Sequence, residues 1–187
     1  MEASQSNQVM VNPNRHRAES KATRVAVLLL LLVSTLLIAV VAIGGAGALS
    51  GGPQLFTFLS IILFLVMAFY VFRWSRGVLA MSAALAILLA VLAIVAAPGW
   101  FSRDQAGFDE PLIPAAILGL VSIVLVPVLL LLVAFAMRGF NQAWNVEVLV
   151  PEHEANENLA EKFDEGGRRV EHDEADYADE PGYDERE

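Results

Sequence analysis

The hydrophobic residues of this chain form four long runs, and charged residues are confined to the connections and to the two ends. The runs cover 25–44, 54–72, 77–97 and 112–137. At a rise of ~1.5 Å per residue, a run of about 20 residues matches the ~30 Å hydrocarbon core of a bilayer. Because backbone in lipid must satisfy its own hydrogen bonds, the pattern predicts an all-α fold, an integral membrane four-helix bundle.

Glycine and proline mark the breaks between the runs. GGAGALSGGP (44–53) separates the first two, and Pro98 with the following glycine is expected to end the third. Pro111 and Pro114 suit the first turn of the fourth helix. The first run could also be the apolar part of a cleaved signal peptide, but its length and the three later runs favour a retained span.

The polar ends divide into three parts. Residues 1–24 form a basic leader without apolar periodicity, which predicts disorder. Residues 139–166 predict a juxtamembrane segment and a short amphipathic helix. Residues 167–187 have too much charge and too little apolar content to fold alone, so we expect a disordered acidic tail.

The juxtamembrane segment contains two apolar patterns. Valine alternates with other residues as in a strand or extended stretch, at Val146, Val148 and Val150. A helix over 152–165 would place three apolar side chains on one face, at Ala155, Leu159 and Phe163. Such a narrow apolar face needs a surface to cover it, which suggests contact with a partner protein at these residues.

The charge is divided unevenly along the chain. Residues 1–146 carry eight Lys/Arg and five Asp/Glu, a net charge of +3, whereas residues 147–187 carry four and sixteen, a net charge of −12. The acidic end repels nucleic acid and anionic lipid headgroups, which excludes nucleic acid as a partner and favours a basic cytoplasmic or membrane protein.

Lys and Arg also predict the orientation. The leader has four, the 44–53 turn none, the 73–76 turn two and the 99–111 loop one. By the positive-inside rule, this alternation predicts a multi-pass protein of the plasma membrane with both termini in the cytoplasm. Tryptophan falls at three expected membrane boundaries, Trp74, Trp100 and Trp144.

Two features predict how the helices pack. Small residues recur at helical spacing in the third run and predict a packing seam, at Ala83, Ala86, Ala90, Ala93 and Ala97. In an alanine-rich helix the same spacing can also arise by chance. Pro127 lies inside the fourth run, where it removes a backbone hydrogen bond and predicts a helix kink, either static or a hinge.

The sequence offers little chemistry. The four runs contain no Asp, Glu, Lys, Arg or His, and the chain has no cysteine. The three histidines are far apart, at His16, His153 and His172, and no spacing suits a zinc site. We therefore expect no catalytic residue, no cofactor and no metal.

Three classes of function remain. The favoured one is a non-enzymatic accessory or scaffold subunit whose acidic cytoplasmic tail binds a partner. The alternative is a small channel or transporter that works as a homo-oligomer, although uncharged spans do not readily line a polar pathway. A membrane enzyme ranks last, since no nucleophile, base or metal cluster is evident.

Overall fold

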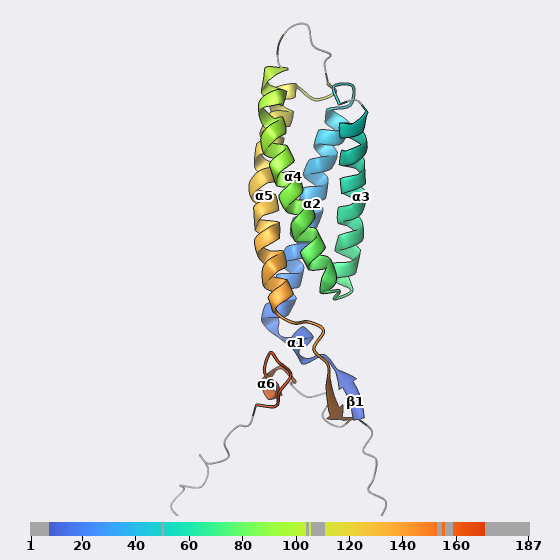
Figure 1. Ribbon diagram of the computed structural model, residues 1–187, viewed down its shortest axis with the longest axis vertical. Helices are drawn as coiled ribbons and strands as arrows, with labels where there is room; N and C mark the ends of the chain where they lie inside the picture. Colours follow the sequence, from blue (N-terminus) through green and yellow to red (C-terminus); the bar gives the residue numbers. More distant parts are fainter. Residues whose placement is uncertain are drawn as a thin grey trace, which may run out of the picture.

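The structure is a computed structural model that describes residues 8–49, 51–103, 105, 111–152, 155 and 159–170. Within these residues, four long helices lie side by side, and a small unit built from both terminal segments lies at one end of them (Figure 1). The long helices are α2 (Ala18–Gly44), α3 (Gly52–Phe72), α4 (Gly77–Ser102) and α5 (Ala115–Asn141). Each is long and apolar enough to cross a membrane, which confirms the prediction of an all-α membrane four-helix bundle.

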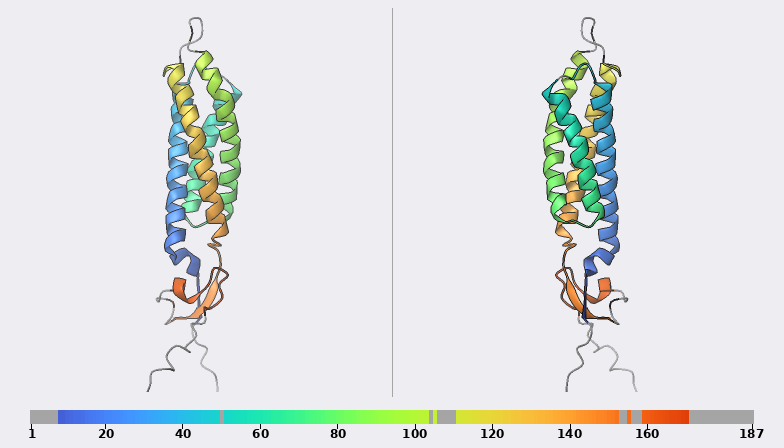
Figure 2. Two further views of the ribbon diagram at one scale, coloured as in Figure 1. Left: turned by 90° about the vertical axis from the view of Figure 1, so that its left-hand side faces the viewer. Right: turned by 90° about the vertical axis from the view of Figure 1, so that its right-hand side faces the viewer.

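The helices run alternately up and down, as the two side views in Figure 2 show. The contact between α4 and α5 is the most extensive in the bundle, and α2 packs on both α3 and α5. The core consists of apolar side chains from all four helices, including Val27, Leu31, Phe64, Leu79, Ala86, Leu129 and Leu132. Exposed leucines such as Leu36 and Leu55 cover the outside, as expected for a surface that faces lipid.

The leader is more ordered than we predicted. Residues 8–24 do not form a disordered segment; they contain strand β1 (Gln8–Val11), helix α1 (Pro13–His16) and the first turns of α2. Helix α2 begins at Ala18, seven residues before the apolar run. Ser20 and Thr23 are buried in these first turns, and Gln142 of the C-terminal segment donates a hydrogen bond to the Thr23 hydroxyl. Residues 1–7 lie outside the described part of the chain.

The prediction that Pro98 ends the third helix is wrong. Helix α4 continues through Pro98 to Ser102, and α5 begins at Ala115, after Pro114. An internal proline costs one helical hydrogen bond, which packing can offset. Trp100 supplies that packing, because its side chain is buried against Ala115 and Leu118 of α5.

The terminal segments form a two-stranded sheet. Strand β2 (Val148–Pro151) pairs antiparallel with β1, with Val9 opposite Val150 and Val11 opposite Val148. The strand expected from the valine alternation is therefore present. Of the expected helix over 152–165, the described residues include α6 (Leu159–Lys162), and residues 153, 154 and 156–158 lie outside the described part of the chain. We call the described residues of 8–17 and 142–170 the terminal cap.

Candidate functional site

Asparagine side chains of the leader hold the C-terminal segment through its backbone. The Asn12 Nδ2 atom donates a hydrogen bond to the carbonyl of Val146 at 3.1 Å. Asn14 Nδ2 donates to the carbonyl of Ala143 at 3.1 Å and to that of Glu165 at 3.0 Å. Asn14 is fully buried, so these bonds replace those that both partners would make with water.

Two arginines of the leader bind the same segment. Arg15 Nε donates to the carbonyl of Trp144 at 3.1 Å, and the Arg17 guanidinium donates to the carbonyl of Phe163 at 2.7 Å. Arg17 also approaches the Glu165 carboxylate at 3.9 Å. These asparagine and arginine contacts join residues 129 to 151 positions apart in the chain. The two ends therefore fold as one unit.

The cap has its own apolar centre. Val150, Leu159 and Phe163 are buried, and they pack against Val11, Val148 and Ala155. The predicted apolar face of Ala155, Leu159 and Phe163 thus packs against the strands of this chain, with Ala155 only partly buried. Contact of this face with a partner protein stays a prediction.

Aromatic rings and arginines pack where the cap meets the bundle. The Trp144 ring is fully buried and meets the Trp74 ring edge-on at 5.2 Å between centroids. The Arg24 guanidinium lies 4.5 Å from the centroid of the Trp74 ring. Arg76 Nε donates to the carbonyl of Phe140 at 2.7 Å, and its guanidinium lies over the Phe140 ring. Such cation–π contacts are worth about 0.5–2 kcal/mol each, depending on burial.

A chain of hydrogen bonds continues this junction into α2. Trp144 Nε1 donates to Gln142 Oε1 at 3.2 Å, and Gln142 Nε2 donates to the Thr23 hydroxyl at 3.1 Å. Gly139 makes the close approach feasible, because a Cβ atom there would lie 3.1 Å from both Trp144 and Leu79. The end of α5, the start of α2 and the cap therefore meet at one point.

The predicted packing seam lies inside the bundle. Its five alanines are at most 7% exposed, at Ala83, Ala86, Ala90, Ala93 and Ala97. The alanines of the same helix that fall off this face are exposed, at Ala80, Ala84 and Ala96. A face of small side chains lets α4 approach its neighbours closely, in agreement with its extensive contact with α5. Its contribution to stability stays a prediction.

Pro127 lies inside α5, which continues past it to Asn141. It lines a hollow between α4 and α5 together with Pro98 of α4. The kink itself stays a prediction, and so does the choice between a static kink and a hinge.

A pocket of about 430 Å³ opens between α3 and α4. The two helices meet near the short turn that joins them, and α4 then leans toward α5 and away from α3 (Figure 1). The space between them is lined by residues of all four helices, among them Ile38, Val41, Phe56, Thr57, Leu92, Ala96, Trp100, Ser122 and Leu125. We call this space the lateral pocket.

The side chains of the lateral pocket are almost all apolar. The Thr57 hydroxyl donates to the carbonyl of Pro53 at 2.7 Å, and the Ser122 hydroxyl donates to that of Leu118 at 2.9 Å. Both hydroxyls are therefore engaged within their own helices. Among the described residues, the lining side chains include no carboxylate, amine or imidazole, so the pocket suits an apolar group.

Within the described ranges of the chain, no group of three or more His, Asp or Glu side chains is placed to hold a metal ion. Comparisons with protein-family models, with curated proteins and with solved structures found no match. The fold and the contacts define a multi-pass membrane protein whose two terminal segments fold together against one end of the bundle.

Proposed function

We propose that this protein is a non-enzymatic accessory or scaffold subunit of the plasma membrane. In this proposal the terminal cap lies on the cytoplasmic side and presents the acidic end of the chain to a basic partner protein. The observation that carries the proposal is the joining of both terminal segments into one unit, which holds the base of the acidic segment at one end of the helical bundle.

The distribution of basic residues supports the cytoplasmic orientation. The cap end of the bundle carries seven of the eight Lys/Arg of residues 1–146, at Arg15, Arg17, Lys21, Arg24, Arg73, Arg76 and Arg138. Arg103 lies at the opposite end. Basic residues next to transmembrane helices are retained on the cytoplasmic side, so this asymmetry favours a cytoplasmic cap.

The last described residues hold the start of the acidic segment in a tight turn. The Asp164 carboxylate accepts hydrogen bonds from the backbone N–H of Arg168 at 2.7 Å and from its Nε at 3.0 Å. The backbone bond, followed by the side-chain bond and the charge of Arg168, lowers the pKa of Asp164 below its usual value. Val170 closes the turn by donating its N–H to the carbonyl of Lys162 at 2.8 Å.

The sequence beyond this turn favours a basic partner. Residues 171–187 contain nine Asp/Glu and one arginine. The cytoplasmic leaflet is negatively charged and repels such a segment. A basic protein surface attracts it, and the attraction speeds diffusional encounter in a salt-dependent way.

The test is crosslinking in cells that express the full-length protein, followed by measurement of binding to each purified candidate partner. The matched variant changes the nine Asp/Glu of 171–187 to Asn and Gln, which leaves the cap and the bundle unaltered. We expect a basic partner that binds the unmodified protein, loses at least tenfold in affinity for the variant and binds more weakly in high salt. Equal binding of the partner to the unmodified protein and to the variant would show that the acidic segment does not bind the partner.

A second assay addresses the channel or transporter alternative. The full-length protein is reconstituted into liposomes, and the flux of ions and small solutes is compared with that of empty vesicles. The accessory role predicts no flux above the empty vesicles. Flux that depends on the protein would replace the proposal by the alternative.

A further inference from the structure

We propose that the lateral pocket binds one hydrocarbon chain of an anionic phospholipid, and that Arg103 binds the headgroup. This inference goes beyond the proposed function, because the pocket is lined by Gly52 and Pro53 at the start of α3 and by Trp100 near the end of α4. These helix ends lie opposite the cap (Figure 1). It depends on three features, namely the apolar lining of the pocket, the guanidinium of Arg103 at its mouth and the N-terminus of α3.

The pocket is open to the space that lipid chains occupy. Ala96 and Leu92 of α4 line it and are exposed on the outside of the bundle, and Phe56 of α3 lines the opposite wall. Its volume of about 430 Å³ falls within the roughly 300–1,000 Å³ of small-molecule pockets. In a bilayer the surrounding medium is hydrocarbon, and an empty apolar space there forfeits dispersion contacts. The hydrocarbon chain of a lipid is the molecule available to fill this space.

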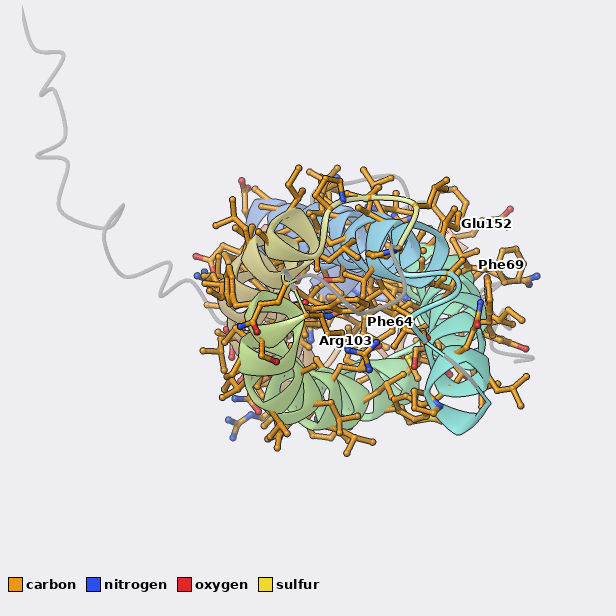
Figure 3. The ribbon with its side chains drawn as sticks, turned by 90° about the horizontal axis from the view of Figure 1, so that it is seen from above. Phe64, Phe69, Arg103 and Glu152 are labelled. Carbon is orange, nitrogen blue, oxygen red and sulfur yellow. The ribbon has the colours of Figure 1, made fainter. Side chains whose placement is uncertain are left out.

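A cation is held at the mouth of this pocket. The Arg103 guanidinium donates to the carbonyl of Ala48 at 2.7 Å and lies 5.7 Å from the centroid of the Trp100 ring, which itself lines the pocket. Seen from this end of the bundle, Arg103 lies over its interior, between α3 and α4 (Figure 3). A guanidinium has five N–H donors, so the remaining ones can bind a phosphate.

The start of α3 adds a second positive feature. Gly52 and Pro53 begin this helix of 21 residues and line the pocket, and none of the described side chains caps its first turn. The N-terminus of a helix carries a partial positive charge and favours an anion. The mouth therefore combines a guanidinium with a helix terminus, which suits a phosphate group above a buried hydrocarbon chain.

The dimensions favour a lipid chain over a second copy of the protein. A helix with its side chains is about 10–12 Å across, which is too wide for a pocket of about 430 Å³ lined by four helices. A hydrocarbon chain is narrow and flexible enough to follow the opening between α3 and α4.

Native mass spectrometry of the full-length protein tests the proposal. The protein is extracted in mild detergent and titrated with phosphatidylglycerol or with phosphatidylcholine of the same acyl chains. We expect one phosphatidylglycerol retained per chain, at several-fold lower concentration than phosphatidylcholine. Ala96→Phe fills the pocket and should abolish retention, whereas Ala84→Phe, at an exposed position of the same helix away from the pocket, should retain the lipid.

The headgroup contact has its own variant. Arg103→Gln removes the charge and should reduce the preference for phosphatidylglycerol to about that for phosphatidylcholine, while the hydrocarbon chain still binds. Equal retention by Ala96→Phe and Ala84→Phe would overturn the proposal. So would protein dimers, in place of lipid adducts, that disappear with Ala96→Phe, because they would make the pocket a subunit interface.

A measurement on the unmodified protein covers the case in which Ala96→Phe does not fold. Phosphatidylglycerol with a diazirine on its acyl chain is activated by light in reconstituted vesicles, and the labelled residues are mapped. We expect labelling concentrated on the pocket wall, at Phe56, Leu92 and Ala96. Labelling spread evenly over exposed side chains such as Leu36 and Leu120 would contradict a specific site.

Discussion

The indole rings of Trp74 and Trp144 meet edge-on, with their centroids 5.2 Å apart and their planes at 80°. Trp74 belongs to the turn between α3 and α4, and Trp144 follows the end of α5. The pair therefore joins the terminal cap to a turn of the bundle. The sequence predicted both residues at membrane boundaries, but Trp144 has no exposed surface and serves internal packing.

Replacing Asn14 by Ala should loosen the cap. The side-chain amide of Asn14 donates to two backbone carbonyls in part-buried hydrogen bonds, and a typical intramolecular hydrogen bond contributes about 0.5–1.5 kcal/mol. We expect faster hydrogen exchange and faster proteolysis of residues 142–170. Asn145→Ala is the control, because Asn145 is an exposed residue of the same segment. In this variant, residues 142–170 should exchange their amide hydrogens at the rate of the unmodified protein.

Leu159→Ala should destabilise the cap by about 2–5 kcal/mol, as large-to-small changes in a core usually do. Leu159 is 2% exposed and packs beside Phe163, whereas Leu149 is 58% exposed on β2. Limited proteolysis of the full-length protein measures the stability of the cap. With Leu149→Ala, the control, this stability should stay within about 0.5 kcal/mol of that of the unmodified protein. If both variants are cleaved at the same rate, the apolar centre of the cap does not form.

The alanine face of α4 gives a prediction for the bundle. Ala90→Leu adds bulk at a position that is 4% exposed and should lower stability by about 1–3 kcal/mol. Ala84→Leu adds the same bulk at an exposed position of the same helix and should be nearly neutral. Thermal unfolding in detergent compares the two. Equal shifts would mean that the spacing of the alanines is accidental.

The proposed orientation predicts the behaviour of reporter fusions. Fusions after Gly51 and Gln105 should report the outside, and fusions after Arg76 and Val170 should report the cytoplasm. The reason is the concentration of Lys and Arg at the cap end of the bundle. The reverse pattern would place the cap outside the cell and remove the cytoplasmic partner from the account.

The sequence predicts the four spans well because each is a long apolar run whose composition alone requires a helix in lipid. It does not predict the helix ends, because single tertiary contacts determine where each helix begins and ends. Packing of Trp100 against α5 stabilises the part of α4 that follows Pro98. Gln142 of the C-terminal segment contacts Thr23 in the polar first turns of α2. Neither contact leaves a signal in local hydrophobicity.

The cap was missed because its contacts join residues far apart in the chain. The one signal available was the short apolar run from Val9 to Val11, which matches the alternating valines of β2 in length. The lateral pocket could not be predicted either, since it arises from the lean of α4 away from α3. Apolar content shows which residues lie in lipid, but it does not give the tilt of one helix against another.

The account rests on the folding of both chain ends into one cap, and a disulfide crosslink tests this most directly. The chain has no cysteine, so introduced pairs have no background. Met10 and Leu149 are exposed partners in the β1–β2 register, and residues directly opposite in an antiparallel pair have Cβ atoms about 4.5–5.5 Å apart. Val148 neighbours Leu149 but points to the other face of the sheet.

The measurement is therefore oxidation, in native membranes, of full-length protein that carries Met10→Cys with Leu149→Cys, followed by detection of the intramolecular crosslink by gel mobility. The account predicts rapid crosslinking of this pair and little crosslinking of Met10→Cys with Val148→Cys. Absence of the crosslink, or equal crosslinking of the two pairs, would show that the ends of the chain do not form the cap.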